Sequence, residues 1–559
     1  MRFPAQRQSA ARGALDAPLA RAPDYLWARW LFLRGLGLVF ASAFYSLLGQ
    51  VHGLVGARGI LPAREYLPAV ARAVPGAERL WLVPTLFWAA PNGRVADWAL
   101  TAAVAGGLVA SLLLVVDRWP RAAVAACTLL FLSCVGVLQD FSAYQSDGML
   151  LEAGFLACFF APAGGRPGLG AVDPPTWGSL WMLRWEWFRI YFESGVVKLA
   201  SGDPHWRDLT AMDRYYETSP LPSWPGWYAQ QLPHWFHAGT VLVTFAVELL
   251  LVWAVFLGRR ARVACCALAT VFQLGIIATA NYAFLNHLVL VLGVLLLDDR
   301  ALGPVARWAR RLAGGRGRAL GNGGRPAGRV PGGVRGARVR PGRTAALAGL
   351  TRAAVLAVVF AATLEPVLPA PLDAPYRALA PFRVANTYGL FATMTPAEDE
   401  IEFQGTRDGR TWTAYPFRYK PQDPREAPGV FAPYQPRFDW NLWFASLGDW
   451  RQNEWVVRTQ ARLLEGSPAV LALFRADPFA GRPPVAVRTV RWRYRFTTWA
   501  ERRATGRWWA RAVVGPYAGT LARGADGELG LAPPAAELPR VEVRGAPNDG
   551  AGGGPGARP

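Results

Sequence analysis

The sequence predicts a polytopic α-helical membrane bundle of about nine spans, followed by a β-rich soluble domain with inserted helices. Three observations lead to this fold class. The chain has 559 residues, 52% of them hydrophobic, and its mean hydropathy is positive, which is too apolar for an ordinary soluble multidomain enzyme. Apolar runs of membrane-spanning length recur through its first two thirds. After residue 381 the pattern changes to alternating segments typical of strands.

The expected spans follow from hydropathy alone. Two of them are only about 14 residues long, which suggests tilted or re-entrant segments. The spans are expected near residues 25–49, 98–117, 122–138, 149–162, 178–200, 238–258, 263–281, 285–298 and 345–366.

The distribution of arginine predicts the orientation. Residues 300–343 contain twelve arginines and no acidic residue, so more than half of the net charge of +21 lies in one loop. Such a loop is better explained as a cytoplasmic topology anchor than as a nucleic-acid site. The expected outer loops 139–148 and 282–284 carry no basic residue. The loop 201–237 and everything after the last span are therefore expected on the extracytoplasmic side.

These boundaries divide the chain into six parts. They are a transmembrane domain at 1–298 with its outer loop 201–237, a cytoplasmic Arg/Gly/Pro-rich loop at 299–344, a last span at 345–366, a linker at 367–381, an extracytoplasmic β-rich domain at 382–522 and a disordered tail at 523–559.

The strong preference for arginine over lysine indicates the source of the sequence. The basic residues are 58 arginines and only two lysines, Lys198 and Lys420, which is typical of a GC-rich bacterial coding sequence. We therefore expect a bacterial cytoplasmic membrane, or the endoplasmic reticulum membrane if the source is eukaryotic. The rarity of lysine also makes Lys198 informative, because an amine can lose its proton more easily than a guanidinium.

The fifth expected span carries an unusual set of charges. Ionisable groups at that depth are expensive unless they pair inside a bundle or line a wet cavity, so they are functional candidates. Glu186, Arg189 and Glu193 share one helical stripe, which would let one arginine bridge two carboxylates. Arg184 and Lys198 lie on a second stripe with Tyr191, and they could instead extend towards water from the helix ends. Possible partners on other spans are Glu152, Glu248 and Asn281.

The outer loop supplies a second candidate set, which is Asp203, His205, Trp206, Arg207 and Asp208. Histidines beside tryptophans are common at membrane interfaces, so we predict no metal site here. Since no phosphate loop, dinucleotide fingerprint or serine nucleophile elbow occurs, we predict no cofactor either.

Alternating residues predict strands in the soluble domain at 382–394, 400–404, 411–419, 486–497 and 508–514. The GTRDG sequence at 405–409 is a plausible hairpin turn. Helical periodicity occurs at 440–447 and 455–473.

With these residues in view, the chain resembles the lipase maturation factor family of multi-pass proteins. The resemblance runs over most of 177–520 and is carried by YFESGVVKLASGDPHWRDLTAMDRYYETSPLPSWPGWY, LPHWFH, NYAFLNHLVL, VANTYGLFATMT, EIEFQGTRDGRTW, PYQPRFDWNLWFASL, RLLEGSPAVLALF and DPFAGRPP. It implies a membrane-anchored maturation role towards secreted lipases, with the bilayer as the other partner. The soluble domain would contact the client, with Trp440, Trp443 and Phe444 as candidates.

A shorter segment, GVVKLASGDPHW, is similar to vitamin K-dependent gamma-carboxylase and its bacterial relatives. That resemblance implies an alternative in which Lys198 is a catalytic base. A transporter that uses the intramembrane charges as a relay is a further alternative, although internal repeats are not evident. The sequence leaves the client and the oligomeric state open.

Overall fold

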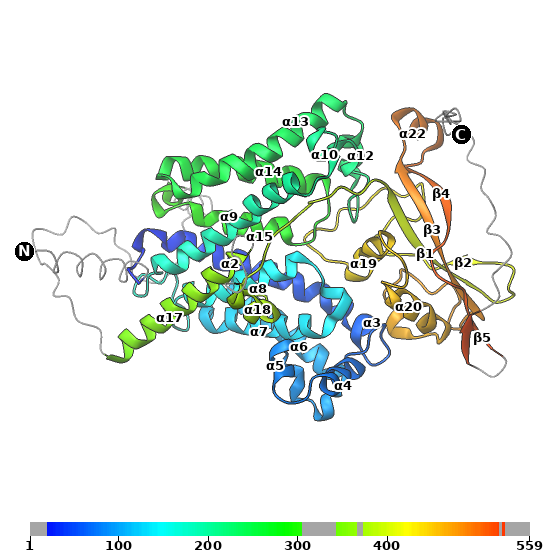
Figure 1. Cartoon of the computed structure of the whole chain (residues 1–559), viewed down its shortest axis with the longest axis horizontal. Coiled ribbons are helices and arrows are strands. Elements are labelled where there is room, and N and C mark those ends of the chain that lie inside the picture. Colours follow the sequence, from blue (N-terminus) through cyan, green and yellow to red (C-terminus); the bar gives the residue numbers. More distant parts are fainter. Residues whose placement is uncertain (1–18, 305–342, 366–372, 525–527, 532–559) are drawn as a thin grey trace, which may run out of the picture.

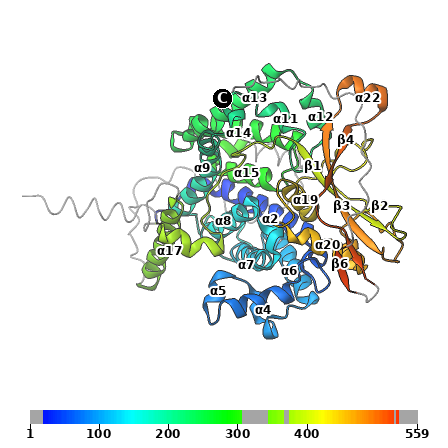
Figure 2. The ribbon, with the colours of Figure 1, turned by 45° about the vertical axis from the view of Figure 1, so that its right-hand side comes forward.

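The computed structural model describes residues 19–304, 343–365, 373–524 and 528–531. Helices form one side of the molecule and a twisted sheet forms the other, with α19 (Arg437–Ser446) and α20 (Glu454–Leu464) between them (Figures 1 and 2). Most of the arginine-rich loop, part of the linker and most of the C-terminal tail lie outside the described residues.

The helical side is built from long helices joined by short ones. The bounds are α2 Leu26–Leu48, α3 Val51–Val55, α4 Ala63–Ala73, α5 Glu78–Leu82, α6 Asp97–Val115, α7 Pro120–Leu138, α8 Gln145–Phe160, α9 Trp177–Ala200, α10 Pro204–Arg207, α11 Met212–Tyr215, α12 Trp224–Gln230, α13 His234–Phe245, α14 Arg259–Thr279, α15 Leu285–Gly293, α17 Arg343–Ala362 and α18 Ala374–Leu379. After α13 the chain continues as the π-helix η5 (Ala246–Leu250) and the 3-10 helix η6 (Leu251–Phe256).

Helices occupy all nine places where spans are expected. Within the described residues, five are both long and apolar enough to cross a membrane, at Pro23–Leu48, Asp97–Val115, Pro120–Ser142, His234–Phe256 and Arg259–Thr279. The expected number of nine spans is therefore not confirmed. Helix α9 is long enough, but its charged residues lower its hydropathy, and it lies inside the bundle with its charged stripe buried.

Local sequence explains where several helices begin. The Thr176 side chain accepts a hydrogen bond from the Ser179 amide at 3.3 Å and caps α9. Pro120 starts α7, where its missing N–H would have no helical partner anyway. Thr498 and Glu501 form a capping box at the start of α22 (Trp499–Thr505).

Within the residues that the structure describes, the C-terminal side contains a six-stranded antiparallel sheet. Its strands are β1 Glu398–Thr406, β2 Thr413–Ala414, β3 Ala486–Phe496, β4 Trp509–Pro516, β5 Leu521–Arg523 and β6 Leu529–Leu531. The order is β2-β1-β3-β5-β6, and β4 pairs with the other end of β3. Helices α19 Arg437–Ser446, α20 Glu454–Leu464, α21 Pro468–Leu471 and α22 Trp499–Thr505 complete this side. The turn at 405–409 joins β1 and β2 as predicted, with Gly409 at a positive φ of 71°.

Three predictions about this half need correction. The strand predicted at 411–419 is reduced to β2, Thr413–Ala414. Residues 382–394 form no strand, because their amides bond to side chains of the helical bundle instead of to a neighbouring strand. The helix predicted at 455–473 is interrupted at Gly466, whose φ of 65° ends α20 before Pro468 starts α21.

Candidate functional site

Helix α9 directs its charged stripe into the protein. Arg184, Glu186, Arg189 and Lys198 are buried, and the Glu193 side chain is only 17% exposed. Arg184 donates two hydrogen bonds to the Leu295 carbonyl, at 2.8 and 2.9 Å, and lies over the Tyr25 ring. Arg184 therefore does not extend to water, and a carbonyl oxygen with an aromatic face accommodates it.

Arg189 joins two carboxylates, although one of them is not the predicted one. It pairs with Glu152 of α8, and its guanidinium lies 3.8 Å from the Glu193 carboxylate one turn along α9. Neither carboxylate oxygen of Glu186 makes a hydrogen bond within the described part of the chain. Glu152 was one of the candidate partners, and Arg189 bridges Glu152 and Glu193 rather than Glu186 and Glu193.

The same carboxylates hold the start of the C-terminal half, residues 386–394, which we call the α9-binding segment. Glu152 accepts hydrogen bonds from the Asn386 amide at 3.0 Å and from the Tyr388 hydroxyl at 2.9 Å. Glu193 accepts the Tyr388 amide at 2.7 Å. The side chain of Asn386 approaches α8 so closely that a Cβ at Gly148 would lie 2.7 Å from its oxygen, which favours glycine there.

The far end of α9 repeats this arrangement. The Lys198 ammonium donates to both Glu248 oxygens at 2.9 and 3.0 Å and to the Leu390 carbonyl at 2.9 Å. Glu248 belongs to the π-helix η5, and such wide turns are frequent at functional sites. An ammonium has three N–H donors, and these acceptors, with the Ser194 carbonyl at 3.3 Å, suit its charged form.

The outer loop reaches the same segment. Asp203 caps α10 through the His205 amide at 2.9 Å and also accepts the Met394 amide at 2.6 Å. The Trp206 indole donates to the Phe391 carbonyl at 3.1 Å. Arg207 and Asp208 are exposed and lie outside this cluster. Among the described residues, no group of three or more metal-binding side chains occurs.

A second buried ion pair joins the two halves at α19. Arg437 donates to the two Asp147 oxygens at 2.7 and 2.8 Å, and both side chains are fully buried. Beside it, the Tyr144 hydroxyl donates to Asn441 at 2.7 Å. Asn281, a candidate partner for the α9 charges, instead donates to the Gly429 carbonyl at 2.9 Å.

The three candidate client contacts lie on α19. Trp440 and Trp443 are buried, and the Trp443 indole donates to Glu398 at 3.1 Å. Phe444 is 45% exposed, and it is the member of the set that offers surface to another protein.

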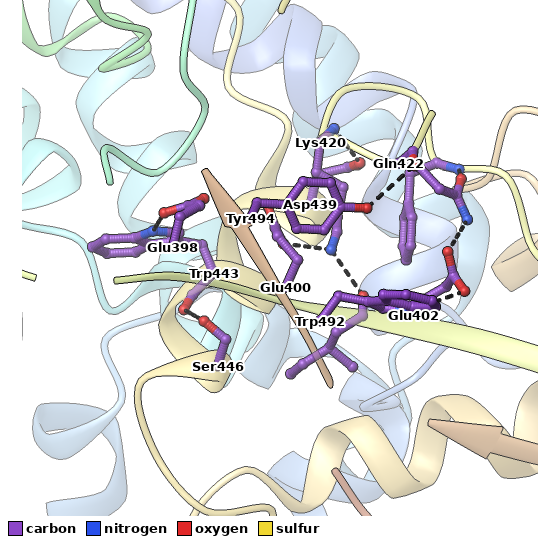
Figure 3. A network of polar contacts seen from close by, with 12 residues as sticks. Glu398, Glu400, Glu402, Lys420, Gln422, Asp439, Trp443, Ser446, Trp492 and Tyr494 are labelled. Carbon is purple, nitrogen blue, oxygen red and sulfur yellow. Dashed lines mark hydrogen bonds and ion pairs between the residues drawn. The ribbon is translucent and has the colours of Figure 1, made fainter. Parts of the chain in front are cut away.

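Strand β1 carries a buried acidic network that sequence reasoning missed (Figure 3). Glu398 and Glu400 are buried on β1, and Glu400 pairs with Lys420. Burial and the neighbouring Glu400 carboxylate raise the pKa of Glu398 well above its usual range. Burial also raises the pKa of Asp439 to about 6, although the Lys420 and Tyr419 amides bond to it.

The missed residues left weak signals in the sequence. Lys420 and Lys198 are the two lysines of this arginine-rich chain, and each forms a buried ion pair with a glutamate. Asp147 precedes an apolar run and Arg437 precedes an aromatic helix. Nothing in one sequence indicates that these two residues meet.

Comparison with known proteins decides the family. The model of the lipase maturation factor transmembrane domain matches residues 27–304, and that of the lipase maturation factor C-terminal domain matches residues 384–519. Lipase maturation factor 1 of Bos taurus is 34% identical over 90% of each chain. The chain belongs to the lipase maturation factor family. Lipase maturation factor 1 of Homo sapiens is 31% identical over 90% of each chain, and lipase maturation factor 2 of Gallus gallus is 32% identical over 89% of this chain and 81% of its own.

The boundaries of the two family domains agree with the contacts between the two halves of the structure. The C-terminal family domain starts at residue 384, so the α9-binding segment belongs to it rather than to the linker. No solved structure matched this chain significantly. Similarity to gamma-carboxylase is not shown by these matches, and Lys198 as a catalytic base stays a hypothesis.

Proposed function

We propose that this chain is a membrane-anchored maturation factor for lipases, whose C-terminal domain is extracytoplasmic and contacts the client. The observation that carries the proposal is the resemblance over about nine tenths of the chain to proteins named lipase maturation factor 1, which includes both the transmembrane and the C-terminal domains.

The positions of the arginines support the proposed orientation. Near the start of α9, Arg21 and Arg121 pair with Asp173, and Arg34 pairs with Asp117. The α9-binding segment and the sheet lie towards the other end of the bundle (Figure 1). Basic residues concentrate on the cytoplasmic side of membrane proteins. The sheet would then project to the extracytoplasmic side.

The exposed end of α19 is the proposed client contact. Phe444 and Leu447 are spaced by three residues, so they share a helical face, and they are 45% and 48% exposed. Exposed aromatic and aliphatic side chains at one place are typical of sites that bind another protein. Trp440 and Trp443 would support this face from inside.

The test is lipase secretion in the native host. A strain that lacks the gene is complemented with the wild-type gene or with Phe444→Ser, and the specific activity of secreted lipases is measured together with the amount of membrane-inserted factor. Phe444→Ser should lower the specific activity while the factor stays at its normal level. Val514→Ser, which removes a similarly exposed side chain from β4, is the matched control and should be neutral. Normal lipase activity without the gene would contradict the maturation role.

The alternative function is a membrane enzyme in which Lys198 is the base. Its specific support is a buried amine held inside the bundle beside Glu248. Lys198→Arg keeps the positive charge and removes the amine that can lose a proton. Normal activity of this variant in the complemented strain would discard the enzyme hypothesis, whereas its loss in a factor that still inserts and folds would favour it.

A further inference from the structure

A cavity of about 300 Å³ lies beside the Lys198–Glu248 pair. Its walls come from α9, α13, η5, α14 and α15, and it is closed by the outer loop and by Leu390 and Phe391 of the α9-binding segment. The lining is mainly apolar and aromatic, and it includes Ile190, Trp206, Phe236, Phe272, Ile276 and Val289. Its volume is at the lower end of the roughly 300–1,000 Å³ typical of ligand pockets, and about twice that of an engineered cavity that binds benzene.

The mouth of the cavity faces the region expected to be lipid. Val243 on α13 and Val271 on α14 line the cavity and are also 53% and 69% exposed. Gly275, one turn after Val271, lines it as well and is exposed. Both helices are among the five that are long and apolar enough to cross a membrane. A molecule that enters between them therefore comes from the bilayer.

The polar groups of the cavity carry no uncompensated charge. Lys198 and Glu248 neutralise each other, and the ammonium donors of Lys198 point at Glu248 and at carbonyl oxygens. Gln273 donates to the Tyr191 hydroxyl at 2.9 Å and accepts from Asn286 at 2.6 Å. Hydroxyl and amide oxygens can accept further hydrogen bonds. Such a site suits a neutral head group that donates O–H bonds better than a carboxylate or a phosphate.

We propose that this cavity binds one hydrocarbon chain of a neutral lipid with a hydroxyl-bearing head, of the monoacylglycerol class. The lipid enters between α13 and α14, its chain packs against the aromatic walls, and its head reaches the oxygens around Gln273. The volume is too small for both chains of a phospholipid, and the distal part of a single chain would extend through the mouth into the bilayer. This binding site does not depend on the proposed maturation role.

The probe is a photoactivatable monoacylglycerol, with a diazirine and an alkyne on its chain, added to the purified full-length protein in detergent. Crosslinked peptides are identified by mass spectrometry. On the wild-type protein the label should fall on cavity-lining stretches of α9, η5 and α14. Unlabelled monoacylglycerol should compete for it, and phosphatidylcholine and an ionised fatty acid should not.

The decisive variant is Gly275→Leu. A Cβ at Gly275 meets no protein atom within 4 Å, so the leucine side chain has room to start at the mouth, and leucine also suits a helix better than glycine. Labelling should fall by about tenfold, which corresponds to a loss of about 1.4 kcal/mol of binding free energy. Gly239→Leu is the matched control, because Gly239 on α13 is also open to added atoms but does not line the cavity. Its labelling should equal that of the wild type.

A second variant tests the same mouth independently, in case Gly275→Leu does not fold. Val271→Trp fills the mouth from an exposed position and should reduce labelling as Gly275→Leu does. Three results would overturn the proposal. They are equal labelling of Gly275→Leu and Gly239→Leu, label confined to peptides outside the cavity, and equal competition by phosphatidylcholine or fatty acid.

Discussion

Replacing Arg437 by methionine should strongly destabilise the junction between the helical bundle and the C-terminal domain. Arg437 donates to Asp147 at 2.7 and 2.8 Å and to the Phe141 carbonyl at 2.8 Å, and neither partner of the ion pair is exposed. Arg437→Met leaves the Asp147 carboxylate buried without its counter-charge. Loss of one partner of a buried pair lowers the free energy of unfolding by about 3–5 kcal/mol.

The double variant Asp147→Leu/Arg437→Met separates this effect from lost packing. It removes both charges, so it should recover much of the loss, with a coupling energy of about 2–3 kcal/mol. The measurement is tryptophan fluorescence of the full-length protein in detergent during a denaturant titration. Arg451→Met is the control, because Arg451 and Asp449 form an exposed pair at 3.3 Å that contributes at most about 1 kcal/mol. A wild-type-like Arg437→Met, or a double variant as unstable as the sum of the single ones, would refute the reasoning.

Three further predictions concern the same contacts. Glu152→Gln should weaken the hold on the α9-binding segment, because Arg189 loses its buried counter-charge, and limited proteolysis should then cut residues 386–394 faster than in the wild type. Asp439 has a folded pKa of about 6, above its unfolded value, so its contribution to stability is complete below the unfolded pKa and is lost as pH rises through about 6. Asp439→Asn should therefore flatten the fall in melting temperature between about pH 4 and about pH 6, and an unchanged pH profile would contradict this assignment. Lys198→Arg should keep the fold, because Glu248 and the Leu390 carbonyl can still accept from a guanidinium, and a large fall in melting temperature would show that the shape of the amine matters.

The positions of the bundle helices could be predicted well, because an apolar run is visible in a short stretch of sequence and does not depend on tertiary contacts. The sequence also predicted that the α9 charges point inwards, since the energetic penalty of charge in lipid does not depend on the partners. Glu152 and Glu248 were among the possible partners, and they pair with Arg189 and Lys198, respectively. Which carboxylate meets which cation depends on how the helices pack, and one sequence does not contain that information.

The segment 382–394 shows where pattern reasoning fails. Its apolar and polar residues predict a strand, but the buried side chains of the segment, Val384, Ala385 and Tyr388, do not alternate along the chain. The amides of Asn386, Tyr388 and Met394 bond to carboxylates of Glu152, Glu193 and Asp203, so the segment needs no neighbouring strand. An extended segment and a strand have the same side-chain periodicity, and only the location of their hydrogen-bond partners distinguishes them.

The attachment of residues 386–394 along the inner face of α9 has a mechanical consequence. Leu390 is bonded to Lys198 through its carbonyl and also forms part of the cavity wall, so the same few residues tether the sheet and bound the internal space. A rotation of the sheet relative to the bundle would therefore strain the hydrogen bond between Leu390 and Lys198, and with it the Lys198–Glu248 ion pair. A molecule in the cavity would contact the α9-binding segment at Leu390 and Phe391. A protein that binds the sheet would act on the same segment from the opposite side.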